Sequence, residues 1–252
     1  MDTTDDAVLG GRLVLRQPKK GHRVGHDAIL LAAATPARAG ERAAEFGAGV
    51  GAAGLALAQR VAGLAVTLVE IDPALAALAA HNAARNGLAD RVRAVAADVE
   101  DPAALMAAGL APGAFDCVLM NPPFNESGRH AVSPDARRRL AHVAAPDLLR
   151  RWCASAAALL RPGGVLTLIW RADARDAVMA ALAVDFGAAV VLPVYPRPDA
   201  AAIRLLVKVV KGAPSECREE PGLTLNDPSG RPSAATEAIL RGGGTLALAA
   251  AA

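Results

Sequence analysis

The chain has 252 residues and a formal net charge of +2, and 53% of its residues are hydrophobic but only 3% aromatic. A chain of this length builds a core without cross-links, and its three scattered cysteines match neither a disulfide framework nor a metal site. We therefore expect a reducing, cytoplasmic location and no bound metal. The acidic first residues and the lack of a long apolar run lead us to expect neither a signal peptide nor a membrane-spanning helix.

Residues 1–40 are predicted to form an extension in front of the main domain. Two short apolar runs between Val8 and Leu15 surround a pair of glycines, a pattern typical of a β-hairpin. Further on, Asp27 precedes the apolar stretch 28–34, which is predicted to be a helix with Asp27 as its N-terminal cap.

A basic loop joins these two elements. Such a run is most often a solvated surface, but it also suits contact with the phosphates of a nucleic acid. A second basic run occurs at 137–139, where an exposed helix face is the competing interpretation. The candidates for phosphate contact in the two runs and beyond them are Lys19, Lys20, Arg23, Arg129, Arg137, Arg138, Arg139 and Arg204.

Residues 41–211 are predicted to form one α/β domain. Apolar strand-like runs alternate there with alanine-rich stretches, and this alternation predicts a doubly wound, mostly parallel sheet with helices on both faces. The last two strands are joined by too few residues for a crossover helix and are expected to pair antiparallel. The seven predicted strands are 42–46, 65–69, 92–96, 115–120, 165–170, 188–194 and 203–210.

Helices are predicted to begin near residues 51, 73, 102 and 146, and a last one is expected over 173–184. Two of these starts are Asp-Pro pairs, in which the aspartate caps the helix and the proline occupies its first position. After residue 211 the composition shifts to proline, glycine, serine and charged residues. We interpret 212–252 as a C-terminal surface segment with a short helix at 234–241.

A proline-rich corner follows the predicted strand 115–120. Asn121 offers a side-chain carbonyl, and Pro122 offers a backbone carbonyl whose direction its ring restricts, with Pro123 stiffening the loop further. Two oxygen acceptors that converge on one point suit an amino group, and Phe124 supplies a flat surface for a planar ring. Asn-Pro-Pro is also a common turn, so a purely structural role is the alternative.

The first predicted strand ends in a glycine-rich turn. Gly47, Gly49 and Gly51 allow a ligand to approach the backbone, and the following helix offers free N–H groups. Glu45 precedes these glycines, where it either faces an ammonium group or holds the loop. The same run satisfies a dinucleotide-binding fingerprint, so the glycines alone do not decide the ligand.

Two further acids follow predicted strands. Glu70 ends the second strand, where a carboxylate accepts hydrogen bonds from both hydroxyls of a ribose; a solvated strand-end acid is the alternative. Asp98 follows the third strand and suits an adenine amino group, with the backbone of Val99 reaching a ring nitrogen; helix capping is the alternative. Carboxylates around the loop would repel a pyrophosphate, whereas a ligand with ribose, adenine and an α-amino acid suits them. These acids favour S-adenosylmethionine as the cofactor.

In this order, residues 45–51, Glu70, Asp98 and 121–124 resemble the class I S-adenosylmethionine-dependent methyltransferases that modify amino groups. Residues 23–31 are similar to the segment before the glycine loop in the tRNA (adenine-37-N6)-methyltransferases that act on valine tRNA. The resemblance covers about residues 10–210 and implies the Rossmann-like class I fold. Phe124 stands where this family often has a tyrosine, so stacking is retained and a phenol hydrogen bond is not.

The resemblance implies transfer of a methyl group to N6 of an adenosine in a single-stranded tRNA loop, without a metal. It assigns catalysis to Asn121, Pro122 and Phe124, cofactor binding to Glu45, Gly47, Gly49, Gly51, Glu70, Asp98, Val99 and Asn121, and substrate binding to Pro123 and Phe124. Because an RNA substrate needs phosphate contacts, Lys19, Lys20, Arg23, Arg137 and Arg138 are added as candidate substrate-binding residues. A protein-glutamine N5-methyltransferase is the alternative within the same chemistry. A nucleotide-binding oxidoreductase and a non-catalytic RNA-binding module are alternatives from other classes.

Overall fold

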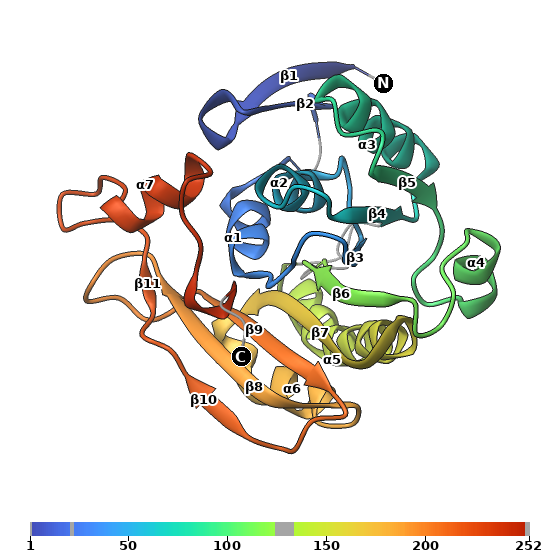
Figure 1. The fold of residues 1–252 in the computed structure, drawn as a ribbon. Helices are drawn as coiled ribbons and strands as arrows, with labels where there is room; N and C mark the ends of the chain where they lie inside the picture. The colour runs from blue at the N-terminus through green and yellow to red at the C-terminus, as the bar shows by residue number, and fades with distance from the viewer. Residues whose placement is uncertain (1, 21–22, 124–133, 250–252) are drawn as a thin grey trace.

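The computed structural model describes residues 2–20, 23–123 and 134–249, and of residues 134–146 it describes the backbone only. A large mixed β-sheet forms its centre, with helices on both faces (Figure 1). Its seven central strands are β3 (Arg42–Phe46), β4 (Ala65–Glu70), β5 (Val92–Ala96), β6 (Phe115–Met120), β7 (Leu160–Arg171), β8 (Phe186–Tyr195) and β9 (Arg204–Lys211).

The strand order across the sheet is β5-β4-β3-β6-β7-β9-β8. All neighbours pair in parallel except β9, which lies between β7 and β8 and is antiparallel to both. This confirms the predicted mostly parallel sheet with an antiparallel last strand. Strand β7 begins at Leu160 rather than at the predicted Val165, because Leu160 already pairs with Phe115 ahead of an irregularity in the register.

Two apolar cores cover the two faces of the sheet. The first lies under α1 (His26–Ala34), α2 (Ala52–Arg60) and α3 (Pro73–Arg85), and the second under α4 (Pro102–Ala107), α5 (Pro134–Leu159) and α6 (Arg175–Leu182). Alanines fill much of the first core, so its helices approach the sheet closely. No helix among the described residues is long and apolar enough to cross a membrane.

The predicted helix starts are confirmed at α3 and α4. Asp72 and Asp101 each accept hydrogen bonds from backbone N–H groups of the first turn, and a proline follows each of them. The predicted cap of α1 is wrong. Gly25 occupies the cap position without a side-chain hydrogen bond, and Asp27 lies inside the first turn. There its Oδ2 accepts a hydrogen bond from Nε of Arg204 at 2.9 Å, so the aspartate links α1 to β9 instead.

The predicted N-terminal hairpin is confirmed, with longer strands than the apolar runs alone indicated. Strands β1 (Thr3–Val8) and β2 (Leu13–Pro18) pair antiparallel around a short 3-10 turn at Leu9–Gly11. Leu13 and Leu15 are fully buried in the first core. The hairpin therefore docks on the main domain, beside α3 (Figure 1).

Residues 212–249 extend the sheet and close the first core. Strands β10 (Cys217–Glu219) and β11 (Leu223–Thr224) both pair in parallel with β8, which brings the sheet to nine strands. Helix α7 (Ala234–Leu240) lies against α1, as Figure 1 shows. After it, Leu246 and Leu248 are buried in the first core, and Leu246 N–H donates to the carbonyl of Ala33 in α1.

Candidate active site

The candidate site lies at the carboxyl ends of β3 and β6. The strand order reverses at this point, because β4 follows on one side of β3 and β6 lies on the other. Such reversal points are where open α/β sheets bind their ligands. Phe46 pairs with Met120, so the glycine loop after β3 and the proline corner after β6 leave the sheet side by side.

The proline corner carries a buried acceptor without a partner. Asn121 is half-buried, and its Oδ1 atom is inaccessible to solvent yet makes no hydrogen bond within the described part of the chain. Pro122 is buried and Pro123 is exposed. A buried carbonyl oxygen that lacks a hydrogen bond loses about 1–3 kcal/mol of solvation free energy, and a role in binding or catalysis is one explanation for such an atom in a native fold. Phe124 lies outside the described residues.

The glycine loop has two closed positions, Gly47 and Gly51, and one open position, Gly49. Gly47, Gly49 and Gly51 all have positive φ angles, which other residues adopt only with strain. A Cβ atom on Gly47 would lie 2.7 Å from the ring of Trp152, whereas a Cβ on Gly49 would meet no atom of the described residues within 4 Å apart from its chain neighbours. Gly49 is therefore the point of the loop that a ligand can approach closely.

Glu70 ties the glycine loop to the end of β4. Its Oε2 accepts the N–H of Gly49 at 2.7 Å and its Oε1 accepts the N–H of Asp72 at 3.0 Å. A carboxylate has about four acceptor positions, and these two hydrogen bonds occupy one position on each oxygen. The side chain is thus held in a fixed orientation. The next residue, Ile71, is 65% exposed, so an apolar side chain directly after Glu70 in the sequence faces solvent.

Glu45 is held inside the protein rather than at the surface of the loop. It is buried, and its Oε2 accepts the N–H of Gly54 in the first turn of α2 at 2.6 Å. Burial raises the pKa of its carboxyl to about 8, although backbone hydrogen bonds from Gly54 and Ala53 act in the opposite direction. Of the two roles considered for Glu45, this geometry supports holding the loop and the helix start.

Asp98 is not the cap of α4, because Asp101 occupies that position. Asp98 is half-buried, and its Oδ1 accepts the N–H of Glu100 at 2.9 Å, which leaves its other oxygen for a ligand. Val99 beside it is buried. The three cofactor-side elements, namely the glycine loop, Glu70 and Asp98, therefore follow three adjacent strands.

Trp152 of α5 forms a wall of the glycine loop. Its ring stands against Gly47 and meets Phe46 edge-on, with the ring centroids 6.3 Å apart. Its Nε1 donates to Glu100 at 3.1 Å, and Glu100 also pairs with Arg151 at 2.6 Å. The residues of this contact are far apart in the chain, so no local sequence pattern connects them.

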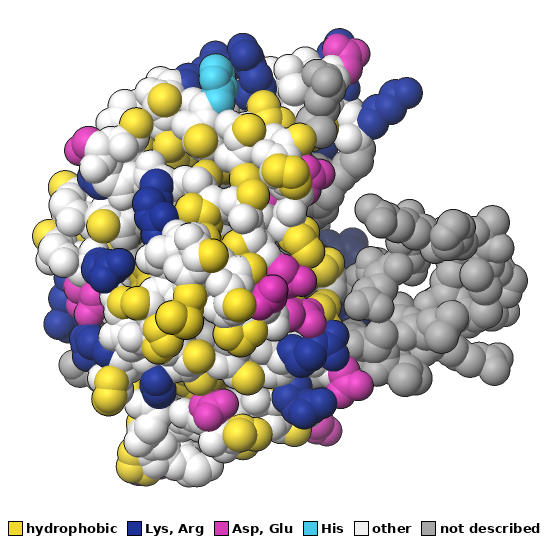
Figure 2. Space-filling view, turned by 90° about the vertical axis from the view of Figure 1, so that its right-hand side faces the viewer, with side chains coloured by type: hydrophobic (Ala, Val, Ile, Leu, Met, Phe, Trp, Pro, Cys, Tyr) yellow, Lys and Arg dark blue, Asp and Glu magenta, His cyan; other side chains and the backbone are white. Residues whose placement is uncertain are grey.

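The basic residues are less available than their sequence suggests. Lys19 pairs with Asp2 at 3.1 Å and Arg23 with Asp6 at 2.8 Å, while Lys20 is exposed. Arg204 pairs with Asp27, as described above. Arg129 lies outside the described residues, and so do the side chains of Arg137, Arg138 and Arg139. On the face shown in Figure 2, basic side chains are dispersed among apolar ones rather than gathered in one patch.

Comparisons with curated proteins find tRNA1(Val) (adenine(37)-N6)-methyltransferases. The one from Porphyromonas gingivalis is 36% identical over 159 residues, which is 60% of this chain and 59% of that protein. The one from Tolumonas auensis is 32% identical over 154 residues, which is 61% of each. The chain thus spans less than two thirds of the length of these relatives.

Comparisons of structure give the same fold. A predicted O-methyltransferase from Agrobacterium tumefaciens has a TM-score of 0.73 at 28% identity and covers 87% of this chain and 98% of its own. TrmN from Thermus thermophilus has a TM-score of 0.52 at 24% identity and covers 74% of this chain and 47% of its own. The sequence profile of the methyltransferase small domain matches residues 22–193. The chain therefore belongs to the methyltransferase small domain family.

Proposed function

We propose that this protein transfers a methyl group from S-adenosylmethionine to N6 of an adenosine in tRNA. The relatives named above point to position 37 of valine tRNA. The observation that carries the proposal is the buried Oδ1 of Asn121 at the reversal point of the sheet, which has no hydrogen-bond partner among the described residues. An amino group fits both oxygens, because it can donate one hydrogen to Asn121 and the other to the neighbouring Pro122 carbonyl.

The residues present fit S-adenosylmethionine. Glu70 retains two acceptor positions for ribose hydroxyls, and Asp98 has one oxygen without a bond to its own loop. Ile71, which lies between Glu70 and Asp98 in the sequence, is exposed and offers an apolar surface to a ring. The described residues leave open space beside the backbone of Gly49. When bound, this cofactor supplies an electrophilic methyl group on a positively charged sulfur, which nearby carboxylates favour.

The proline corner positions the acceptor nitrogen. An aromatic amine is a weak nucleophile, because its lone pair is delocalised into the ring. Asn121 Oδ1 and the Pro122 carbonyl accept the two amino hydrogens and so direct the remaining lone pair toward the cofactor side of the site. This contribution is orientation and electrostatic stabilisation, and it requires neither a covalent intermediate nor a strong base.

The same corner favours nitrogen over oxygen as the methyl acceptor. A hydroxyl group becomes a good nucleophile only when a base removes its proton. An amide oxygen such as Oδ1 of Asn121 accepts hydrogen bonds but is not a base of that strength. A side-chain amide of glutamine has the same –NH2 group as adenine, so protein methylation is the second candidate that this geometry allows.

The N-terminal basic loop is proposed to contact the RNA. Its ion pairs, Lys19 with Asp2 and Arg23 with Asp6, lie at the surface, where such pairs contribute about 0–1 kcal/mol. RNA phosphates therefore compete with these acids at little cost. An adenosine in a single-stranded loop enters a pocket more easily than a base in a helix, because less stacking is lost.

Transfer from labelled S-adenosylmethionine tests this proposal. The protein is incubated with total tRNA from cells that lack N6-methyladenosine in tRNA, and the product is digested to nucleosides. We expect label in N6-methyladenosine, and none when the tRNA is already modified. Label in protein would move the substrate to glutamine, and label in N2-methylguanosine or on a ribose would refute the proposed acceptor.

A further inference from the structure

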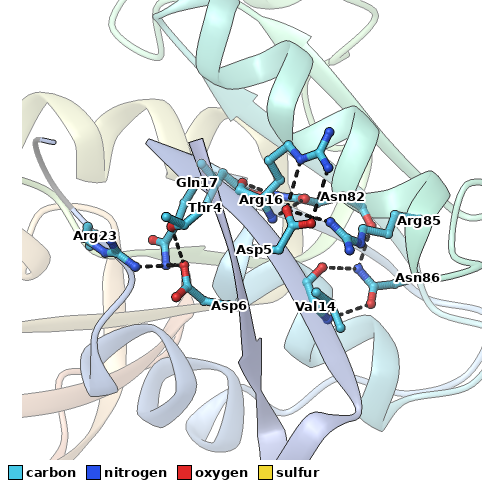
Figure 3. A network of polar contacts seen from close by, with 11 residues as sticks. Thr4, Asp5, Asp6, Val14, Arg16, Gln17, Arg23, Asn82, Arg85 and Asn86 are labelled. Carbon is cyan, nitrogen blue, oxygen red and sulfur yellow. Dashed lines mark hydrogen bonds and ion pairs between the residues drawn. The ribbon is translucent and has the colours of Figure 1, made fainter. Parts of the chain in front are cut away.

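The N-terminal hairpin is attached to the main domain by two asparagine side chains, Asn82 of α3 and Asn86 at the C-terminal cap of the same helix (Figure 3). Asn82 accepts the N–H of Arg16 at 2.8 Å and donates to its carbonyl at 3.0 Å. Asn86 does the same with Val14, at 2.9 and 3.0 Å. Each side-chain amide therefore pairs with the N–H and C=O groups of one residue of β2, as a neighbouring strand would.

The spacing of helix and strand makes this pairing possible. Residues four apart on a helix are separated by about 6 Å, and residues two apart on a strand by about 6.8 Å. Asn82 and Asn86 thus match Arg16 and Val14 in register. Strand β1 covers one edge of β2, and the two asparagines cover the other, so a two-stranded sheet that would be weak alone has both edges paired.

Asn82 makes one contact that Asn86 lacks. It is fully buried, and its Nδ2 also donates to the carbonyl of Val50 at 3.0 Å, within the glycine loop between Gly49 and Gly51. The additional bond of Asn86 goes to the carbonyl of Asn82, inside its own helix. A single side chain therefore joins the hairpin to the glycine loop. In the same loop the N–H group of Gly49, the residue before Val50, donates to Glu70.

The hairpin side of this junction is itself fixed by charged contacts. Asp5 of β1 pairs with Arg16 at 3.0 Å and with Arg85 of α3 at 2.8 Å, and hydrogen bonds from these two arginines lower the pKa of Asp5 to about 2. Gln17 of β2 donates to Asp6 at 2.8 Å and accepts the N–H of Val24 at 2.9 Å. The contact of Gln17 with Val24 thus links the hairpin to the segment that leads into α1.

We infer that Asn82 is a positioning residue that couples the docked N-terminal hairpin to the affinity of the glycine loop for its cofactor. The inference rests on the proposed function, because it takes S-adenosylmethionine as the ligand of that loop. Val50 is the residue through which the coupling acts. Without the Asn82 amide, its buried carbonyl loses its partner and the positive-φ backbone around it loses a restraint.

Asn82→Ala and Asn86→Ala form a matched pair for the test. Each removes one amide that pairs with β2, but only the first also removes the bond to Val50. Binding of S-adenosylmethionine is measured by calorimetry without RNA, below the melting temperature of both variants. We expect Asn82→Ala to raise Kd at least about tenfold and Asn86→Ala to change it less than about threefold, although both lower the melting temperature.

Each outcome has a separate meaning. No binding by the unaltered protein would refute the proposed function. Binding by the unaltered protein, with equal affinity in Asn82→Ala or equal losses in both variants, would overturn the role of Asn82 alone. If Asn82→Ala does not fold, the hydrogen-exchange comparison on the unaltered protein decides the coupling instead, because it needs no variant.

Hydrogen exchange on the unaltered protein provides a test that needs no variant. Coupling between two sites is reciprocal, so a ligand that orders the glycine loop must also stabilise the hairpin. We expect S-adenosylmethionine to slow exchange at the amides of Val14 and Arg16 in β2. Exchange at these amides that is the same with and without bound cofactor would show that the hairpin and the loop are independent.

Discussion

At the scale of single residues, two glutamates at the ends of neighbouring strands have different surroundings. Glu70 accepts backbone N–H groups from the glycine loop and from the start of α3, and it stands at the site. Glu45 points into the protein, where burial raises the pKa of its carboxyl to about 8. A glutamate that is neutral below this pH holds α2 in place without adding a charge to the core.

Glu45→Gln is expected to change how stability depends on pH. The pKa of Glu45 is raised from 4.5 to about 8 on folding, so its contribution to the free energy of unfolding is fully present below about pH 4.5 and is lost as pH rises through 8. The loss is at most about 5 kcal/mol, from 1.36 kcal/mol per pKa unit. Glutamine does not titrate, and its side-chain oxygen still accepts the Gly54 N–H.

Denaturant unfolding of both proteins between pH 5 and 9 provides the measurement. The free energy of unfolding of Glu45→Gln should fall less than that of the unaltered protein across this range, and the variant should be the more stable of the two above pH 8. Parallel curves would show that Glu45 remains ionised in the folded protein.

At the scale of elements, the glycine loop shows which parts of a site follow from local sequence. The loop, the acids after the strands and the proline corner were all placed correctly at strand ends, because strand periodicity and helix-start signals are local. Trp152 and Asn82 were not connected to the loop, because α5 and α3 reach it only through tertiary packing. The predicted cap at Asp27 was wrong for the same reason: its carboxylate bonds Arg204, which comes from a strand far away in the sequence.

Gly47→Ala and Gly49→Ala are expected to affect different properties. Both place an alanine at positive φ, which costs about 1–2 kcal/mol. Gly47→Ala also forces a Cβ against Trp152, whose ring is held by Phe46 and Glu100, so it should destabilise the protein by a further 1–3 kcal/mol or so. Gly49→Ala meets no protein atom and should instead weaken cofactor binding more than it lowers stability.

Thermal melts and cofactor titrations on the two variants separate these effects. A larger loss of stability in Gly49→Ala than in Gly47→Ala would contradict the assignment of Gly47 as a closed position and Gly49 as the open one. Unchanged cofactor affinity in Gly49→Ala would show that the ligand does not approach the loop there.

At the scale of the whole molecule, the two ends of the chain complete the first core. The hairpin adds Leu13 and Leu15, and the last described residues add Leu246 and Leu248. Arg12 of the hairpin turn donates to the carbonyl of Gly242 at 3.0 Å, so the two ends also meet each other. Composition alone predicted a surface segment over 212–252, because isolated leucines among small and polar residues carry no periodic signal.

Leu248→Ala tests whether the C-terminal segment stabilises the fold. Leu248 is fully buried, and removal of a buried leucine side chain typically lowers the free energy of unfolding by about 2–5 kcal/mol. Val184→Ala is the control, since Val184 is 75% exposed and its loss should change stability by less than about 0.5 kcal/mol. Equal effects of the two substitutions in denaturant unfolding would mean that the segment does not contribute to the core in solution.

The central claim is that Asn121 orients an amino group for methylation. The most direct measurement compares Asn121→Ala with the unaltered protein in two assays, the Kd for S-adenosylmethionine and the single-turnover rate of methyl transfer to tRNA. We predict a rate at least about 100-fold lower, the size of effect seen when one orienting hydrogen-bond group is removed from an active site, with a nearly unchanged Kd. Transfer to N6 of adenosine at the unaltered rate would contradict the account.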